Sequence, residues 1–137
     1  MHTQRFLILK TLTDFLVSMN CFTKVYSQIE TPIDRTEVPA VNVTWTNDLT
    51  ELFGSKTQAT QKLSITISII CRDDNWQEQS DLLSEQMHAQ LMQTNLHDDI
   101  YQIIKKSSSV DQHMADLTCG VINHEYLISY YSNIFQN

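Results

Sequence analysis

Histidine and cysteine are the residues of this chain whose types could carry catalytic or metal chemistry. The five histidines show no H-x-x-x-H or H-x-H spacing, and the three cysteines form no C-x-x-C pair. Only the run His97-Asp98-Asp99 places a histidine beside carboxylates. We interpret this run as a solvated helix end, with a metal site as the alternative reading. The spacing therefore predicts no metal ligands and no disulfide framework.

Cys71 is the strongest candidate nucleophile, because a Cys-His-Asp arrangement forms in space and not in sequence order, and His97 or His124 could complete it. The segment before Cys71 alternates apolar and polar residues, however, and Cys71 continues its apolar side. A thiol buried in that position would be inert. We therefore predict no catalytic residue and no enzymatic activity. A small cytosolic hydrolase that uses Cys71 or the His97 run remains the alternative.

Acidic residues follow this segment at Asp73, Asp74, Glu78, Asp81 and Glu85. Several carboxylates together could bind a divalent cation, since hard cations prefer oxygen ligands. Carboxylates in the first turns of a helix also interact favourably with the helix dipole, by about 0.3 to 1 kcal/mol each. The second explanation needs no ligand, and we predict no metal here.

The overall composition excludes several classes of function. The 137 residues include 9 basic and 16 acidic side chains, a net charge of −7, and no basic run is longer than Lys105-Lys106. Tight binding to DNA or to anionic membranes needs clustered Lys and Arg, so neither is expected. With only Gly54 and Gly120, the chain cannot build a glycine-rich phosphate loop, and no cofactor is predicted.

The N-terminal apolar run is too short for a secretory signal. Phe6-Leu7-Ile8-Leu9 is interrupted by Lys10 and Asp14. No segment approaches the roughly 18 uninterrupted apolar residues of a membrane span. We expect a soluble protein that is made in the cytosol.

Hydrophobic periodicity predicts the helices and strands that would hold these residues in place. Spacings of three and four predict a helix over 3–20, and a short β-prone run over 21–28 precedes a turn. Alternation predicts a strand over 39–46, and the polar stretch 47–60 is expected to be a mobile loop. The clearest strand covers 63–72, with Leu63, Ile65, Ile67 and Ile69 on one face.

The second half of the chain repeats this pattern. Asn75, with Glu78 three residues later, resembles a helix cap, and the helix is expected to continue to about Thr94. Strands are predicted over 101–105 and 120–131, with an exposed connection over 107–116. The fold class is then α+β: one domain over 1–137, with one mainly antiparallel sheet of about five strands and two helices on one face, in the order α-β-β-β-α-β-β.

Two places are candidate assembly contacts. The first is the polar loop, because a loop this long can become ordered on binding. The second is one side of the last strand, which is less polar than a free surface should be; packing against the first helix would also explain it. The candidate residues are Asp48, Glu51, Leu52, Phe53, Lys56, Val121, Leu127 and Tyr131.

A motif near the first two strands resembles the tail terminator proteins of long-tailed phages. The family's Val-Tyr strand, Pro-x-Asp loop and Val-Pro-Ala step are matched by Val25-Tyr26, Pro32, Asp34 and Val38-Pro39-Ala40. The order of elements, helix first and strand last, matches over nearly the whole chain.

The resemblance implies a homohexameric ring that caps the tail tube, ends its polymerisation and presents a surface to the head completion protein. Such a virion protein, phage- or prophage-encoded, would assemble in the host cytoplasm and remain in the tail. DNA would pass through the ring without specific binding, and six copies with a total charge of about −42 would repel it if acidic residues lined the lumen. A head-tail connector or a tail completion subunit is the alternative within the same class.

Overall fold

The computed structural model describes residues 3–27, 38–52, 58–72, 74–111 and 119–133. Its elements are α1 (Gln4–Ser18), β1 (Lys24–Ser27), β2 (Ala40–Leu52), β3 (Gln58–Arg72), α2 (Trp76–Gln93), β4 (Ile100–Val110) and β5 (Cys119–Asn133). The predicted α+β class and the order α-β-β-β-α-β-β are confirmed. Pro32 and Asp34, which belong to the motif described above, lie outside the described residues.

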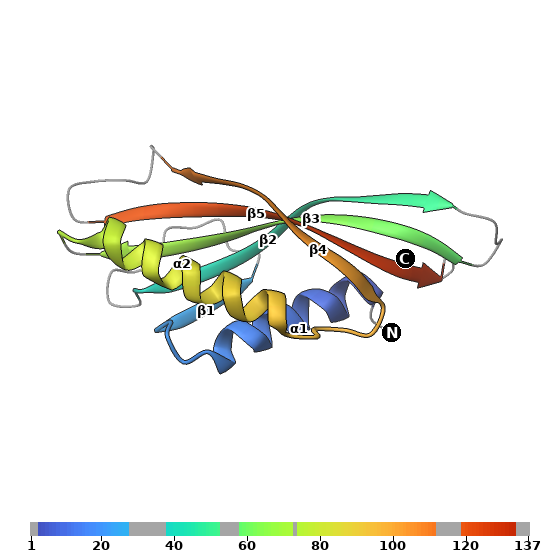
Figure 1. The fold of residues 1–137 in the computed structure, drawn as a ribbon, viewed down its shortest axis with the longest axis horizontal. Helices are drawn as coiled ribbons and strands as arrows, with labels where there is room; N and C mark the ends of the chain where they lie inside the picture. The colour runs from blue at the N-terminus through green and yellow to red at the C-terminus, as the bar shows by residue number, and fades with distance from the viewer. Residues whose placement is uncertain (1–2, 28–37, 53–57, 73, 112–118, 134–137) are drawn as a thin grey trace.

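The five strands form one sheet in the order β1-β2-β3-β5-β4. β1 pairs with β2 in parallel, and the other three pairings are antiparallel, so the sheet is mainly antiparallel as expected. Both helices lie on the same face of the sheet, and no helix of the described chain covers the opposite face (Figure 1). We call these the inner and the outer face.

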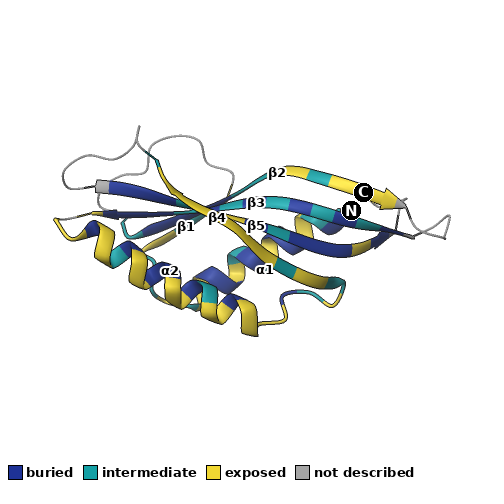
Figure 2. Ribbon diagram, turned by 45° about the horizontal axis from the view of Figure 1, so that its top comes forward, coloured by how far each residue is buried: buried dark blue, intermediate teal, exposed yellow. Residues whose placement is uncertain are grey.

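The core lies between the inner face and the helices. Along β3, Leu63, Ile65, Ile67 and Ile69 are at most 1% exposed, and each contributes about 1.5–3 kcal/mol of burial free energy. β5 adds Ile122, Tyr126, Ile128 and Tyr130, as its alternation predicted. Figure 2 shows the buried side of each helix turned toward the sheet.

A side-chain cap is present at the start of α1 but not at the start of α2. Thr3 caps α1, because its hydroxyl oxygen accepts a hydrogen bond from the amide of Phe6 at 3.1 Å. The chain leaves α1 at Asn20, whose φ of 57° is tolerated by Asn more readily than by most residues. Asn75 stands at the N-cap position of α2 but makes no side-chain capping bond, so the predicted cap is wrong in that respect. Neither α1 nor α2 is long and apolar enough to cross a membrane.

The hairpin of β2 and β3 is longer than predicted. The expected loop over 47–60 is wrong: β2 continues to Leu52, β3 begins at Gln58, and Asn47–Leu52 pair with Ala59–Ser64. A register shift between Trp45 and Asn47 interrupts the alternation, so the strand pattern ends early in the sequence although the hydrogen-bonded ladder does not. Residues 53–57 lie outside the described chain.

β4 is also longer than predicted. Ser107–Val110 belong to the strand and pair with Ile122–Glu125, although this stretch was expected to be an exposed connection. A second register shift, between Lys105 and Ser107, and exposure of most side chains hide the strand in the sequence. Residues 112–118 are not described.

Candidate functional site

An open groove of about 610 Å³ lies between α2 and β4. His124, on the inner face of β5, is part of its lining and is 3% exposed. Ser84 from α2 and Ser108 from β4 reach the two nitrogens of its ring. Lys105 and Asp81 also line the groove. This is the closest approach of nucleophile-type and base-type side chains that we find in the described residues.

The hydrogen-bond chain determines which nitrogen of His124 carries the proton. Ser84 donates its only hydroxyl proton to the carbonyl oxygen of Ser80, at 2.6 Å. The Ser84 oxygen therefore accepts from Nε2–H of His124, at 2.7 Å. Nδ1 then carries a lone pair and accepts from the hydroxyl of Ser108, at 2.8 Å. Both ring nitrogens are satisfied in the neutral imidazole.

The environment keeps that ring neutral. Burial is the largest cause that lowers the pKa of His124 to about 4; Lys105 and the neighbouring His88 act in the same direction, and Asp81 opposes them with a smaller effect. His88 forms a hydrogen bond of 2.9 Å between its Nδ1 and the hydroxyl of Tyr126. Burial raises the pKa of Tyr126 to about 12, so this hydroxyl keeps its proton at neutral pH.

This arrangement suits attachment of α2 and β4 to the sheet better than it suits catalysis. The proton of Ser84 points to a backbone carbonyl and not to His124, which is the reverse of an activated nucleophile. Ser108 does donate to His124, but a ring with a pKa near 4 is a weak base at neutral pH. The groups therefore satisfy one another inside an otherwise apolar layer.

The residues of the hydrolase alternative do not converge. Cys71 is opposite Gly120 and His124 is opposite Ile67, four residues further along the ladder, which is about 13 Å. His97 follows the C-terminal end of α2, an 18-residue helix about 27 Å long, whereas Cys71 lies just before its start. Cys71 is fully buried in the core.

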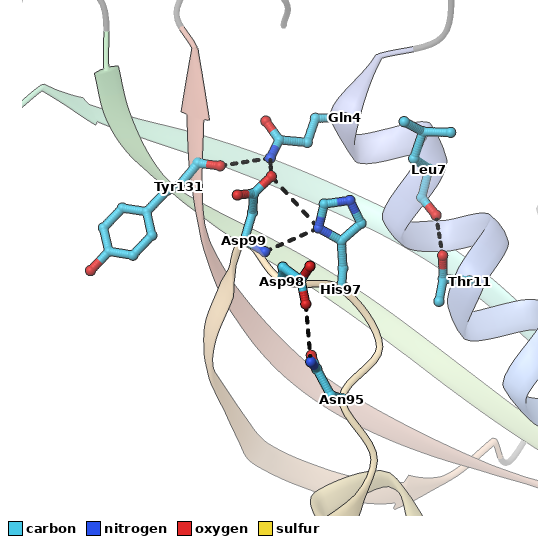
Figure 3. Close-up of polar contacts among 8 residues, drawn as sticks. All are labelled: Gln4, Leu7, Thr11, Asn95, His97, Asp98, Asp99 and Tyr131. Carbon is cyan, nitrogen blue, oxygen red and sulfur yellow. Dashed lines mark hydrogen bonds and ion pairs between the residues drawn. The ribbon is translucent and has the colours of Figure 1, made fainter.

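His97 takes part in a polar cluster at the end of the sheet where α1 begins (Figure 3). Its Nδ1 accepts a hydrogen bond from the amide of Asp99 at 3.1 Å. The Nε2 group of Gln4 donates to a carboxylate oxygen of Asp99 and, at 2.7 Å, to the carbonyl oxygen of Tyr131. Asn95 donates to Asp98 at 3.2 Å. The cluster ties α1 to the start of β4 and to the end of β5.

Metal ligation has little support in this geometry. Among the residues that the structure describes, no three His, Cys, Asp or Glu side chains are grouped so as to hold a metal ion. Of the acidic run, Asp73 is not described, and Glu78 lies in the first turn of α2, where its charge interacts favourably with the helix dipole.

Asp48 is not the surface contact that was predicted. Its side chain is 4% exposed, and its Oδ2 accepts hydrogen bonds from Tyr130 at 2.8 Å and from Arg5 at 3.2 Å. Arg5 in turn lies over the ring of Trp45, 4.1 Å from its centroid. The register shift after Trp45 turns Asp48 to the inner face. The polar stretch 47–60 gave no reason to expect a partly buried ion pair there.

Val121 is also buried, and that prediction is wrong as well. It packs with Ala40 and Ile70 in a second cluster on the outer face, and Tyr26 and Val38 pack against the cluster. Neither helix is involved, because both lie on the inner face, so the first helix does not account for the apolar side of β5.

The other candidate contacts remain at the surface or undescribed. Glu51 is exposed and forms an ion pair with Lys62 at 3.5 Å. Leu127 is half-buried on the outer face, and Leu52 is the last residue of β2. Tyr131 is 43% exposed and packs on Tyr101 with ring centroids 4.6 Å apart. Phe53 and Lys56 lie outside the described residues.

Two groups of interacting residues were not predicted from the sequence. Ser80, Ser84 and His88 are spaced by four, which places them in one row on α2 beside the apolar row of Leu83 and Met87, and this spacing was a usable signal. The pair of Arg5 and Asp48 gave no such signal, because 43 residues separate its members.

Comparison with known proteins adds no relative. No protein-family model and no curated protein sequence matches the chain. The function must therefore be argued from the residues and the fold.

Proposed function

We propose that this chain is a structural subunit that assembles with copies of itself into a ring, normally of six, at the end of a phage tail tube. There it ends polymerisation of the tube and presents a surface to the head completion protein. The proposal involves no reaction and no cofactor. It remains the function implied by the resemblance at Val25-Tyr26 and Val38-Pro39-Ala40, together with the order of elements.

The observation that carries it is a set of exposed apolar side chains on a sheet that no described helix covers on its outer side. Leu49, Tyr101, Ile104 and Tyr131 are each at least 40% exposed. They lie toward the same end of the sheet, on β2, β4 and β5. Large apolar side chains gathered on a small domain mark a surface that meets another protein.

The groove between α2 and β4 supports the same reading indirectly. Its serine and histidine groups are satisfied by one another, and the ring of His124 is a weak base at neutral pH. These residues hold α2, β4 and β5 together. A subunit that binds other subunits needs such a rigid structure.

Assembly is testable with the purified chain. Light scattering over a concentration series should reveal a species of about 95 kDa, six times the 15.9 kDa of one chain, and negative-stain images should show rings with a central hole. A chain that stays monomeric at every concentration and in the presence of tail tubes would contradict the proposal.

A second experiment distinguishes the tail end from the head. Tail tubes polymerised with the chain should be shorter than tubes polymerised without it, and the chain should be found at one tube end only. Rings that bind the head portal and ignore tube ends would instead support the connector alternative.

A further inference from the structure

Three polar side-chain atoms at one end of the inner face are closed off from bulk solvent and have no hydrogen-bond partner in the protein. They are Oδ1 of Asp48 on β2, Oε1 of Gln61 on β3 and Oγ of Ser132 on β5. The side chain of Asp48 and the residues Gln61 and Ser132 are each 4% exposed. Such atoms are rare in native proteins, because each has lost its contact with water without a replacement.

The strand register places the other two residues on either side of Gln61. Asp48 pairs with Leu63 and Ser132 pairs with Ala59, so both are diagonal neighbours of Gln61 on the inner face. Diagonal neighbours have Cα atoms about 7–8 Å apart. At that spacing, two side-chain oxygens that do not touch can be bridged by one water molecule.

A hydrogen bond from Tyr130 brings the carboxylate of Asp48 close to Gln61. Tyr130 pairs with Gln61, whereas Asp48 lies on β2, on the other side of β3. The Tyr130 hydroxyl nevertheless donates to Oδ2 of Asp48 at 2.8 Å, so this bond crosses β3 beside Gln61. Arg5 donates to the same oxygen at 3.2 Å. Both donors use Oδ2, and Oδ1 is the oxygen left without one.

The three atoms determine what can bind between them. A carboxylate oxygen and an amide oxygen only accept hydrogen bonds, and a serine hydroxyl can donate or accept. A group between Asp48 and Gln61 must therefore donate on two sides, as water does. Arg5 already balances the charge of Asp48, which disfavours a metal cation. Ala59 is the smallest inner-face side chain of β3, so bulky apolar groups of this strand do not fill the corner beside Ser132.

We propose that this end of the inner face binds two ordered water molecules. The first donates to Oδ1 of Asp48 and to Oε1 of Gln61. The second donates to the other lone pair of Oε1 of Gln61 and accepts from the hydroxyl of Ser132. Together the two molecules join β2, β3 and β5 beyond the apolar part of the core. This inference does not depend on the proposed ring.

Magnetic relaxation dispersion of water counts such molecules in solution, because a buried water exchanges slowly with bulk solvent. Gln61→Leu removes the acceptor that both molecules share and should lower the number of long-lived waters by two. Ser132→Ala removes one anchor and should lower it by one. Gln102→Leu, at an exposed glutamine of β4, is the matched control and should leave the number unchanged.

Stability gives a second readout. In Gln61→Leu, Oδ1 of Asp48 stays buried and loses its bridging water, so the equilibrium constant for unfolding should rise at least about 5-fold. The Ser132 hydroxyl also contributes through its water, so Ser132→Ala should not stabilise the chain. A Ser132→Ala chain that is more stable than the wild type and keeps all its long-lived waters would contradict the second water.

A crystal structure of the wild-type chain tests the site without any substitution. Electron density for two waters is expected, each about 2.7–3.2 Å from the oxygens named above. A direct hydrogen bond from the amide nitrogen of Gln61 to Asp48, with no water between them, would overturn the proposal. Equal numbers of long-lived waters in the wild type and in Gln61→Leu would also overturn it, once circular dichroism has shown that the variant folds.

Discussion

His124, on β5, connects α2 with β4 through hydrogen bonds. Its ring accepts from Ser108 on β4 and donates to Ser84 on α2, and both bonds form in the neutral state. A charged ring would present Nδ1–H to Ser108, whose hydroxyl would have to turn and accept. Burial of the ring is the main reason why protonation is unfavourable, so part of the stability of the fold depends on the neutral state of this side chain.

Acidification should destabilise the protein through His124. The unfolded ring has a pKa near 6.5 and the folded ring about 4, so above pH 6.5 both are neutral and the ring makes no difference. As the pH falls from 6.5 to 4, unfolded chains bind a proton that folded chains refuse, and stability declines. Allowing for solvent screening in the open groove, we expect a loss on the order of 1–2 kcal/mol in urea titrations at successive pH values.

Two variants identify the group responsible. His124→Phe should flatten this acid-dependent loss, because no titrating ring remains. Ser108→Ala removes a hydrogen bond that favours the neutral ring but keeps the ring buried, so it should lower stability at neutral pH and retain most of the acid-dependent loss, because burial is the largest cause of the lowered pKa. Equal slopes in wild type and His124→Phe would show that other groups cause the acid loss.

Glycine is needed at position 120 because the ring of Trp76 lies very close, and not because of the backbone conformation. A Cβ atom at this position would lie 2.3 to 2.5 Å from ring atoms of Trp76, at the start of α2. Gly120→Ala should therefore cost about 1–3 kcal/mol of stability, measured from the urea midpoint. Combined with Trp76→Leu, which removes the ring, the cost should be clearly less than additive. Additive costs would mean that the clash is relieved by backbone movement.

At the scale of elements, α1 is held at its N-terminal end by one amide. Gln4 donates to Asp99 before β4 and to the carbonyl oxygen of Tyr131 in β5, so a single side chain joins three elements (Figure 3). The ion pair of Arg5 with Asp48 adds a link to β2.

Gln4→Ala should loosen this end selectively. Loss of the amide removes its hydrogen bonds to Asp99 and to the carbonyl oxygen of Tyr131, at a cost of about 1–3 kcal/mol. Hydrogen exchange of the first turns of α1 should accelerate more than that of α2. Thr11→Ala is the control, since its hydroxyl only donates to the carbonyl of Leu7 on the exposed side of the same helix. Equal acceleration in both variants would mean that the clamp contributes nothing.

At the scale of the whole molecule, the fold separates a face covered by both helices from a face that no described helix covers. The inner face carries both helices and nearly all the large buried side chains (Figure 2). The outer face and the two edges retain Leu49, Tyr101, Ile104 and Tyr131 at the surface.

The alkylation rate of Cys71 tests whether the core on the inner face stays closed to solvent. Because it is fully buried, alkylation in native buffer should be at least about 100-fold slower than in urea, and should follow global unfolding. Cys21 is only partly buried and should react sooner, although burial raises the pKa of its thiol. Peptide mapping separates the sites. Rapid modification of Cys71 in the folded protein would contradict the structure and revive the hydrolase alternative.

Elements with a regular hydrophobic period could be predicted from the sequence. The alternation of β3 and β5 and the apolar row of α2 were readable, because the side chains on one face meet one continuous core. The fold class and the placement of both helices on one face followed from these. His124 was also correctly placed on the inner face of β5.

The ends of the hairpins, the burial of Asp48 and Val121, and the partners of His124 depend on contacts between distant segments and could not be predicted. Register shifts after Trp45 and Lys105 break the alternation while the hydrogen-bonded ladders continue, so local pattern and actual strand diverge there. The partners of Asp48 and His124 lie 16 to 82 residues away along the chain. Such contacts depend on how strands are aligned across the sheet, and that alignment leaves no periodic trace in the chain.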